Sequence, residues 1–339
     1  MRHWLALLPA ALLGIAMSGP RTAAAQTTPG GYAAREDVRS FARELAERDG
    51  FDEAALVETL SGAEFRPDIL RIMEPLPSGR RSWKIYRSRF VNERRIRSGV
   101  SFWRDHEQAL ARAARDYAVP EPIIVAIIGV ETEYGRNMGD YRVLDALATL
   151  AFDYPRRASF FRSELEHFLL FAREENIVAA GPRGSYAGAM GIPQFMPGSV
   201  RKWGVDFDGD GRRDLTVSAE DAIGSVANFL RAHGWESGQE TAVPARVSGR
   251  HYLPLLELGV QPFVAARDLH RYGVTTLAAV DPDSPVALIE LESPNAHPQY
   301  YLGLHNFYVL TRYNQSSFYA MSVIDLARAI GQREGRRLP

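Results

Sequence analysis

The stretch Glu121–Gly135 (EPIIVAIIGVETEYG) places the strongest constraint on how this chain can fold. Pro120 and Pro122 flank its first residue and favour a helix start, because proline is tolerated in the first helical turn. The residues that follow, Ile123–Val130, are apolar almost without a break. A helix that is apolar on every side belongs in a domain interior, and this one is too short to cross a membrane. We therefore expect it to be the central helix of a globular core.

Glu131 lies near the end of this helix and shares a face with Ile124, Ile127 and Ile128. A carboxyl group on a buried face is costly when ionised, so its pKa should be raised. A raised pKa suits a proton donor at neutral pH. A structural glutamate paired with an arginine explains this helix equally well. Glu133 points elsewhere and is expected at the rim.

Length, charge and cysteine content narrow the function classes. The 339 residues are enough for one large or two medium domains with a substantial core. A net charge of −1 gives no bulk attraction to nucleic acid. The chain has no cysteine, which excludes disulfides, a thiol nucleophile and a thiolate metal site.

Residues 1–25 have the features of a secretory signal peptide. Arg2 and His3 precede the apolar run Trp4–Met17, and the small residues Ala23–Ala25 form an A-x-A-type cleavage site before Gln26. Because no cysteine is present for lipidation, we expect an exported, soluble protein, not a lipoprotein, in the periplasm of a Gram-negative cell. Residues 26–32 read as a linker.

Helical periodicity covers most of the chain up to Gly234. The predicted helices are Ala34–Arg48, Glu53–Leu60 with Asp52 as its cap, Ile69–Met73, a long Asn92–Tyr117 interrupted near Gly99, Leu144–Ala151, Tyr154–Glu175 and Ala219–His233. From about Gln239 the composition shifts to short alternating runs, and Val243–Ser248 and Val286–Leu291 are expected to be strands. Phe307–Thr311 is a third candidate strand or an extended segment, and Ser317–Arg333 is a final helix.

Gly181–Pro197 (GPRGSYAGAMGIPQFMP) is rich in glycine and carries polar groups, without the phosphate-binding GxxxxGK[ST] pattern. Ser185 and Gln194 suit hydrogen bonding to a polyhydroxyl ligand, and Tyr186 and Phe195 suit stacking on sugar faces. An ordinary tight loop remains the alternative, since glycines alone indicate only close turns. Arg156 and Arg157 start a helix against its dipole, which favours carboxylate or ligand binding by one of them.

Asp206–Asp214 (DFDGDGRRD) is the most specific short motif. Oxygen donors at loop positions 1, 3, 5 and 9, with glycine at position 6, match the first part of an EF-hand calcium loop. Val217 replaces the glutamate expected at position 12, and Glu220 or Asp221 could supply that carboxylate. Asp221 also fits a capping box with Ser218. A metal-free turn is the alternative, but its four carboxylates would repel one another. The predicted ligands of a structural Ca²⁺ are Asp206, Asp208, Asp210, Arg212, Asp214 and Asp221.

Several ordered blocks together resemble the lytic murein transglycosylase B family, from about residue 30 to the C-terminus. The blocks are Gly129–Gly135, Leu144–Leu150, Tyr154–Ala158, Gly188–Pro197, Asp206–Asp214, Asp221–Asn228 and Thr311–Asn314. The resemblance implies a mainly α (α+β) fold with a lysozyme-like helical core, a flanking helical domain and a small antiparallel β subdomain. The corresponding expected divisions are 33–238 for the helical and catalytic region with the metal loop at 206–221, 239–295 for the β subdomain, and 296–339 for a return to the core.

The resemblance also implies a function. Members of this family cleave the β-1,4 bond between N-acetylmuramic acid and N-acetylglucosamine in peptidoglycan and leave a 1,6-anhydro sugar. Glu131 matches the catalytic acid/base, and no cofactor is implied for catalysis. The positions that match the glycan groove are Tyr86, Arg156, Arg157, Ser185, Gln194, Phe195, Tyr313, Asn314 and Tyr319. The expected partner is the glycan strand, not nucleic acid. Cell-wall synthesis or division proteins stay open as partners, and a monomer is the default.

Two other interpretations stay open at this stage. A lysozyme-type hydrolase would use Glu131 with Glu133 or Asp145 positioning a water molecule. A non-catalytic peptidoglycan-binding protein would have no use for an intact acid. The chain lacks the lipobox cysteine of lipid-anchored members, and little sequence follows the final predicted helix, so we expect no appended peptidoglycan-binding domain.

Overall fold

The computed structural model describes residues 31–74 and 82–336, and these fall into two compact units. The first unit contains the described parts of Ser78–Tyr134 and Ile223–Pro339, and the second contains those of Ala11–Pro77 and Gly135–Ala222. The predicted signal peptide and most of the predicted linker lie outside the described residues. The predicted divisions at 238 and 295 stay a prediction, since the compact units follow other boundaries.

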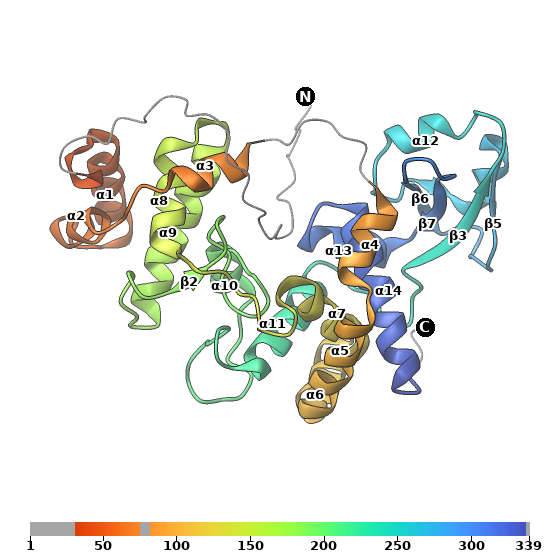
Figure 1. Ribbon diagram of the computed structural model, residues 1–339, viewed down its shortest axis with the longest axis horizontal. Coiled ribbons are helices and arrows are strands. Elements are labelled where there is room, and N and C mark those ends of the chain that lie inside the picture. The colour runs from red at the N-terminus through yellow and green to blue at the C-terminus, as the bar shows by residue number, and fades with distance from the viewer. Residues whose placement is uncertain (1–30, 75–81, 337–339) are drawn as a thin grey trace. The chain divides into compact units, whose positions relative to one another are not determined.

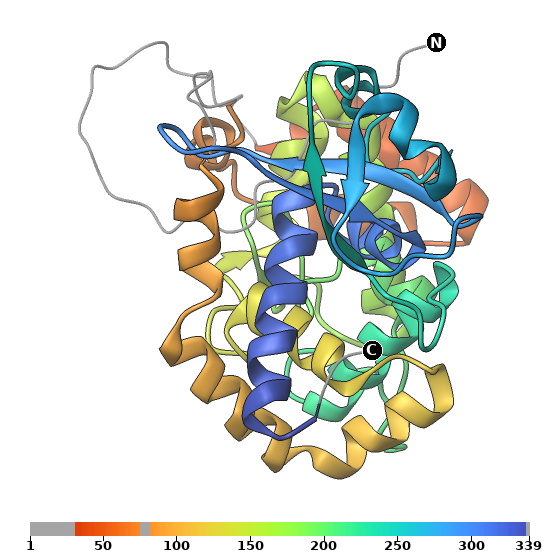
Figure 2. The same ribbon diagram turned by 90° about the vertical axis from the view of Figure 1, so that its right-hand side faces the viewer.

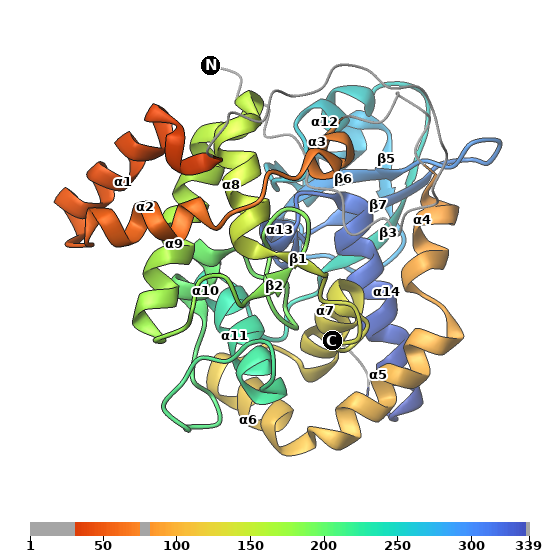
Figure 3. The same ribbon diagram turned by 60° about the vertical axis from the view of Figure 1, so that its left-hand side comes forward.

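The first unit is mainly helical and contains the central apolar helix (Figure 1). Its helices are α4 (Trp83–Phe90), α5 (Glu93–Asp105), α6 (Glu107–Tyr117), α7 (Glu121–Thr132), α12 (Leu253–Glu257), α13 (His305–Tyr313) and α14 (Ser317–Arg333), with the short 3₁₀ helix η3 (Ala266–Tyr272). The long helix α14 packs against α7, α5 and α4 (Figures 1 and 3). Every residue of α7 from Pro122 to Val130 is buried, which confirms the prediction of a core helix.

A small antiparallel sheet completes this unit, in the strand order β4-β6-β7-β3-β5 (Figure 2). The strands are β3 (Ala242–Val247), β4 (Val264–Ala265), β5 (Val274–Thr276), β6 (Pro285–Leu291) and β7 (Gln299–Gly303). The β6–β7 connection reaches α4, where the Trp83 amide donates to the Glu292 carbonyl at 2.6 Å. The two predicted strands correspond to β3 and β6. The sheet continues to Gly303, beyond the predicted boundary at 295, because β7 pairs with both β3 and β6.

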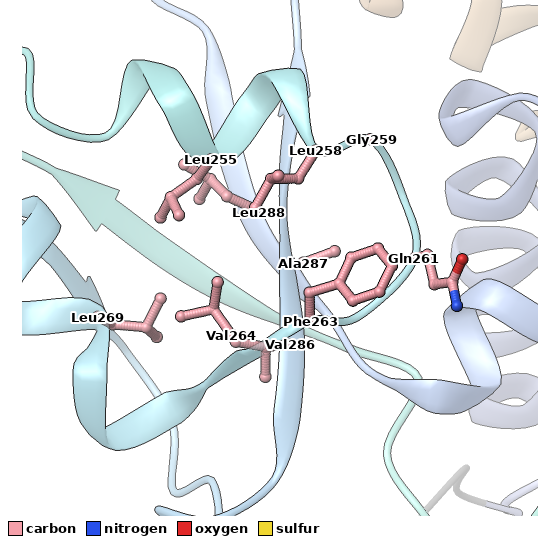
Figure 4. A pocket seen from close by; sticks show the side chains of 10 residues that line it. All are labelled: Leu255, Leu258, Gly259, Gln261, Phe263, Val264, Leu269, Val286, Ala287 and Leu288. Carbon is pink, nitrogen blue, oxygen red and sulfur yellow. The ribbon is translucent and has the colours of Figure 1, made fainter. Parts of the chain in front are cut away.

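An apolar hollow lies in the β subdomain beside β6 (Figure 4). It is lined mostly by aliphatic side chains, including Leu255, Val264 and Leu288, and its volume is about 10 Å³. A volume of this size holds about one water molecule. The hollow is therefore a packing imperfection of the subdomain core and cannot hold a sugar ring.

The second unit contains the N-terminal helices and the glycine-rich and acidic loops (Figure 3). Its elements are η1 (Tyr32–Ala34), α1 (Glu36–Asp49), α2 (Glu53–Ser61), α3 (Pro67–Met73), β1 (Tyr141–Arg142), α8 (Val143–Asp153), η2 (Pro155–Arg157), α9 (Ala158–Glu174), β2 (Arg183–Gly184) and α10 (Pro197–Trp203). The helix α11 (Ala219–Ala232) begins in this unit and ends in the first. The pair α8 and α9 forms its core, and α3 and α10 pack on them. The predicted cap is confirmed, because Asp52 accepts the Ala55 amide at 2.8 Å.

Two predictions of local structure are wrong. The helix expected over Asn92–Tyr117 breaks at His106 and continues unbroken through Gly99, which is buried within α5. Phe307–Thr311 was a candidate strand, but it lies inside α13. Phe307, Val309, Leu310 and Thr311 are all buried there, so tertiary packing outweighs the β propensity of aromatic and branched residues.

Within residues 31–74 and 82–336, no helix is both long enough and apolar enough to span a bilayer.

Candidate active site

Glu131 occupies the last turn of α7 and is half-buried. The Tyr319 hydroxyl donates a hydrogen bond of 2.7 Å to its Oε1 atom. Burial raises the pKa of the Glu131 carboxyl from 4.5 to about 7, although the Tyr319 hydrogen bond acts in the opposite direction. A carboxyl with this pKa exists in both protonation states near neutral pH, so it can give up a proton and later take one.

Tyr319 is fully buried in the first turn of α14, and its backbone amide donates to the capping Ser316 side chain. Burial and the nearby Glu131 raise the pKa of the Tyr319 hydroxyl well above 10, so the hydroxyl keeps the proton that it donates. Burial has the same effect on the pKa of Tyr313. The Tyr313 and Tyr319 rings are stacked, with centroids 6.3 Å apart. The environment of Glu131 is therefore aromatic and poor in charge.

Tyr86 and Asn314 lie in the same unit as Glu131. The Tyr86 ring contacts Phe318, the neighbour of Tyr319, with centroids 5.6 Å apart. Asn314 caps the C-terminus of α13 directly after Tyr313 and is half-buried. The first unit thus holds five of the predicted site residues, and its aromatic members form one cluster near the acid.

The chain leaves α7 through an unusual turn. Glu133 and Tyr134 both have left-handed backbone, with φ of 51° and 63°, and Gly135 follows with φ of 80°. The Tyr134 hydroxyl donates to the Arg95 carbonyl at 3.0 Å. A Cβ atom at Gly99 or Gly129 would lie 2.4 or 2.5 Å from the Tyr134 hydroxyl oxygen. The two glycines therefore make the space in which Tyr134 holds this turn, two residues after Glu131.

Both candidates for a second catalytic carboxylate are engaged with arginines. Glu133 forms a 2.8 Å ion pair with Arg94 and lies 3.9 Å from Arg95. Asp145, in the second unit, is 1% exposed and accepts two hydrogen bonds from Arg142, at 2.7 and 2.8 Å. Neither carboxylate has the half-buried, lightly hydrogen-bonded environment of Glu131.

Ser185 organises the tight turn of the glycine-rich loop. Its Oγ atom accepts the amides of Ala187 and Ala189 at 3.3 and 3.0 Å, and its own amide donates to the Ala189 carbonyl. A serine hydroxyl can accept two hydrogen bonds and still donate one. Ser185 therefore retains a proton with which to bind an acceptor on a ligand.

Gln194 is held in one orientation within the same loop. Its Nε2 atom donates to the carbonyls of Met138 and Gly191, at 3.0 and 2.9 Å. Two carbonyl partners require the amide nitrogen on that side, so the Oε1 atom points away from them. The residue adopts left-handed backbone with φ of 52°. This strained, half-buried residue offers a fixed acceptor, which suits a hydroxyl or amide of a ligand.

The other predicted residues of the second unit differ in accessibility. Phe195 is only 2% exposed, so the structure offers no open ring face there for stacking on a sugar, in contrast to the sequence interpretation. Arg156 is exposed, and Arg157 is half-buried with its guanidinium 4.1 Å from the centre of the Phe160 ring. Burial lowers the pKa of Arg157. The aromatic contact keeps the planar Arg157 head in place.

The acidic loop (Asp206–Asp214) presents a group of oxygen donors. Carboxylate oxygens of Asp206, Asp208 and Asp210 lie within 4.8 Å of one another, and all three residues are exposed. Oxygen-only donor sets of this kind suit Ca²⁺, which takes six to eight oxygen ligands. Gly209 and Gly211 have φ of 81° and 90°, which lets the loop turn tightly around the three side chains. The residues present therefore fit the predicted ion, which would be held by this trio.

Asp221 has a structural role in the acidic loop, and its role as a metal ligand stays a prediction. This side chain is 1% exposed, and its two oxygens accept the amides of Phe207, Asp208 and Asp214 at 2.7, 3.2 and 2.8 Å. It closes the acidic loop by joining its two ends and does not lie among the three grouped carboxylates. Asp214 likewise accepts the Thr216 and Val217 amides. Arg212 stays a predicted ligand.

Sequence reasoning gave no role to Tyr134 or to Glu164. Glu164, on α9, is 9% exposed and accepts the Gly198 amide at 2.8 Å, at the start of α10. Burial raises the pKa of its carboxyl. The sequence did contain a signal for Tyr134. Gly99 and Gly129 lie on neighbouring predicted helices, and a glycine inside a helix often marks a place where another group packs closely against the backbone. No local pattern connects Glu164 with Gly198, because 34 residues separate them.

The fold, the half-buried acid and the acidic loop define a class of protein. The transglycosylase SLT domain matches residues 33–328, and the chain belongs to this family of lytic murein transglycosylases with a lysozyme-like core. It is 42% identical over 310 residues to the membrane-bound lytic murein transglycosylase B of Escherichia coli K12, covering 89% of this chain and 84% of that protein.

Solved structures of related enzymes have the same fold. The soluble lytic transglycosylase SltB1 of Pseudomonas aeruginosa is 43% identical, with 88% and 99% of the two chains covered and a TM-score of 0.83. The Escherichia coli lytic transglycosylase Slt35, solved in complex with calcium, is 42% identical, with coverages of 91% and 96% and a TM-score of 0.82. SltB3 of Pseudomonas aeruginosa, in complex with NAG-anhNAM-pentapeptide, is 31% identical, with coverages of 87% and 79% and a TM-score of 0.75.

Proposed function

We propose that this lytic murein transglycosylase cleaves the β-1,4 bond between N-acetylmuramic acid and N-acetylglucosamine with Glu131 as its single acid and base. The observation that carries the proposal is the Glu131 carboxyl itself: burial raises its pKa to about 7, and the Tyr319 hydroxyl holds it by a hydrogen bond. The anhydro-muramoyl ligand bound by the relative SltB3 supports the product class.

The reaction consists of two proton transfers at one carboxyl group. Neutral Glu131 protonates the glycosidic oxygen, and the bond from that oxygen to C1 of the muramic acid breaks. The substrate's own N-acetyl group stabilises the positive charge that develops at C1. The Glu131 carboxylate then takes the proton of the muramoyl C6 hydroxyl. At the same time the C6 oxygen bonds to C1, which closes the 1,6-anhydro ring. Tyr319 donates to Glu131 in its anionic state and holds its orientation between the two steps.

A single carboxylate is sufficient because the nucleophile is part of the substrate. Hydrolytic glycosidases generally need a second carboxylate to activate water or attack C1. Glu133 and Asp145 are each paired with arginines, which supports an assignment of both to structure. The hydrolase interpretation therefore lacks a suitable second group among the residues that the sequence offered for that role.

Each unit by itself contains groups that we assign to glycan binding. Ser185 would donate and Gln194 would accept, while Arg156 and Arg157 would bind carboxylates of peptide stems. Tyr86, Tyr313 and Asn314 would line the sugar sites near the acid. Tyr319, which is fully buried, would act there through its hydrogen bond to Glu131, and the buried Phe195 ring would support the glycine-rich loop by packing. The acidic loop would hold a structural Ca²⁺, as the calcium complex of Slt35 suggests. We further propose a periplasmic location, because residues 1–25 read as a signal peptide.

The decisive experiment digests purified peptidoglycan sacculi in water labelled with oxygen-18 and analyses the soluble products by mass spectrometry. The expected products end in anhydro-muramic acid, are lighter by one water than reducing-end products, and carry no label. Labelled reducing ends would make the enzyme a hydrolase. Binding to sacculi without release of products, at several pH values and with calcium present, would favour a non-catalytic protein.

A further inference from the structure

We propose that the acidic loop positions Gln194, so that a cation bound by Asp206, Asp208 and Asp210 controls the geometry of the glycine-rich loop and not only the stability of the fold. The inference rests on the proposed role of Gln194 in binding the glycan. A continuous series of contacts within the second unit connects the two loops.

The first contact joins the backbones of the two loops. The Ile192 amide donates to the Leu215 carbonyl at 2.8 Å. Gly191 lies so close that a Cβ atom there would be 2.4 Å from the same carbonyl oxygen. Gly191 has φ of 69°, and Leu215 is 4% exposed. Leu215 directly follows the acidic loop, so a displacement of the loop's end must also move Gly191 or break this hydrogen bond.

The second contact passes from Gly191 to the Gln194 side chain. The Gly191 carbonyl accepts both the backbone amide and the Nε2 atom of Gln194, at 3.2 and 2.9 Å. The direction of the Oε1 acceptor is therefore set by the position of the Gly191 carbonyl. The remaining partner, the Met138 carbonyl, limits rotation on the other side.

The third set of contacts fixes Leu215 relative to the carboxylate trio. Asp221 accepts the Asp214 amide at one end of the acidic loop and the Phe207 and Asp208 amides at the other. Arg213 ties the same segment to α9 through ion pairs with Glu174 and Glu175, at 3.1 and 2.7 Å. The two ends of the acidic loop are thus joined through Asp221, and the exposed carboxylates of Asp206, Asp208 and Asp210 are accessible to a cation.

Electrostatics gives the acidic loop two states of different rigidity. Three carboxylates within 4.8 Å repel one another when all are ionised, and a divalent cation removes that repulsion. The cation-bound loop is the more rigid, and the Leu215 carbonyl passes this difference to Gly191 and Gln194. Coupling between two binding sites is reciprocal, so a glycan fragment bound at Gln194 should also raise the affinity for Ca²⁺.

Hydrogen exchange with residue resolution tests the inference on the full exported chain, titrated with CaCl₂ well below its unfolding temperature. We expect Ca²⁺ to slow exchange at Ile192 and Gln194, as well as at Gly209 and Gly211, by about tenfold or more. Amides of strand β3 should not change, which separates the effect from global stabilisation. Protection confined to residues 206–217, or no calcium response at all, would overturn the inference.

Gly191→Ala tests the backbone contact directly, because its methyl group would meet the Leu215 carbonyl. Gly238→Ala is the matched control, since Gly238 has a similar φ of 74° and open space around it. We expect Gly191→Ala to bind Ca²⁺ within about threefold of the parent while losing the calcium response at Ile192, and the control to keep it. A retained response in Gly191→Ala would contradict the proposed route.

A second variant covers the case in which Gly191→Ala does not fold. Asp210→Asn removes one charge of the trio and should abolish the calcium response at both loops together. In the parent enzyme, Ca²⁺ should lower KM for soluble glycan fragments severalfold and change kcat little. Anhydro products with calcium-independent exchange at Ile192 would refute the coupling alone, whereas coupling without lytic products would refute the proposed reaction alone.

Discussion

The end of α7 and the glycine-rich loop both force non-glycine residues into left-handed backbone, and they do so by different means. After α7, Glu133 and Tyr134 are held by side chains, namely an ion pair with Arg94 and a phenol ring packed over two helical glycines. In the glycine-rich loop, Gln194 is held by the carbonyls of Met138 and Gly191.

This difference corresponds to two separate tasks, proton transfer and ligand binding. The acid needs a desolvated carboxyl in a fixed place, and apolar packing around one helix provides it without charged neighbours. The loop needs polar atoms aimed at a ligand, and a network of backbone hydrogen bonds provides them. The acid should therefore be insensitive to the cation, whereas the loop should respond to it.

The largest expected effect comes from removing the acid. Glu131→Gln keeps the size of the side chain and its hydrogen bond from Tyr319 but has no proton to transfer. We expect kcat for release of anhydro-muropeptides to fall by about 10³-fold or more, since general acid–base catalysis contributes roughly 10²–10⁴-fold per transfer. Binding to sacculi should be retained. Full lytic activity in this variant would falsify the single-carboxylate mechanism.

The same substitution should raise stability at alkaline pH. The folded pKa of about 7 lies above the ordinary 4.5, so ionising Glu131 costs the folded state about 3 kcal/mol at most once both states are charged. Below pH 4.5 the carboxyl is neutral in both states and the cost disappears. Urea unfolding should therefore show Glu131→Gln more stable than the parent at pH 8 and equal at pH 4. Equal stability at both pH values would mean that the carboxyl is not desolvated.

The sequence predicted the apolar helices around Glu131 better than the hydrogen-bonded glycine-rich loop. Helix α7 and helix α14 were recognised because burial on all sides, or on one clear face, leaves a periodic pattern. The break in the predicted helix Asn92–Tyr117 was placed near Gly99, whereas it lies at His106. A glycine can interrupt a helix or can leave space for a side chain that packs on it, as Gly99 does for Tyr134. Only the position of Tyr134 in three dimensions distinguishes these cases.

The geometry of the glycine-rich loop depends on backbone amides and carbonyls, which nearly every residue has. Ser185 and Gln194 were found by their side-chain chemistry and by resemblance. Their orientation is set by backbone groups, namely the amides of Ala187 and Ala189 for Ser185 and the carbonyls of Met138 and Gly191 for Gln194. Backbone carbonyls leave no trace in a sequence. For the same reason the sequence could not show that Asp221 accepts three backbone amides and so joins the two ends of the acidic loop.

A smaller effect is expected where side chains hold the turn after α7. Gly129→Ala should raise helix propensity by about 1 kcal/mol. However, its Cβ would lie 2.5 Å from the Tyr134 hydroxyl, and overpacking of this kind costs roughly 1–3 kcal/mol. We expect net destabilisation in the parent and net stabilisation in a Tyr134→Ala background, measured by urea unfolding. If Gly129→Ala changed the free energy of unfolding with the same sign in both backgrounds, the Tyr134 ring would not occupy the space beside Gly129.

The smallest effect on activity and stability is expected for Glu133→Gln. This substitution is the most direct test of whether Glu131 alone is the catalytic carboxylate. Glu133→Gln weakens the ion pairs with Arg94 and Arg95, of which Arg94 is largely exposed, so stability should fall by about 1 kcal/mol or less. Because the Tyr134 ring still holds the turn, kcat should fall less than about tenfold, with the products unchanged. The two substitutions, Glu131→Gln and Glu133→Gln, make the same chemical change two residues apart. A loss at Glu133 as large as that at Glu131 would identify a second catalytic carboxylate and contradict the single-carboxylate mechanism.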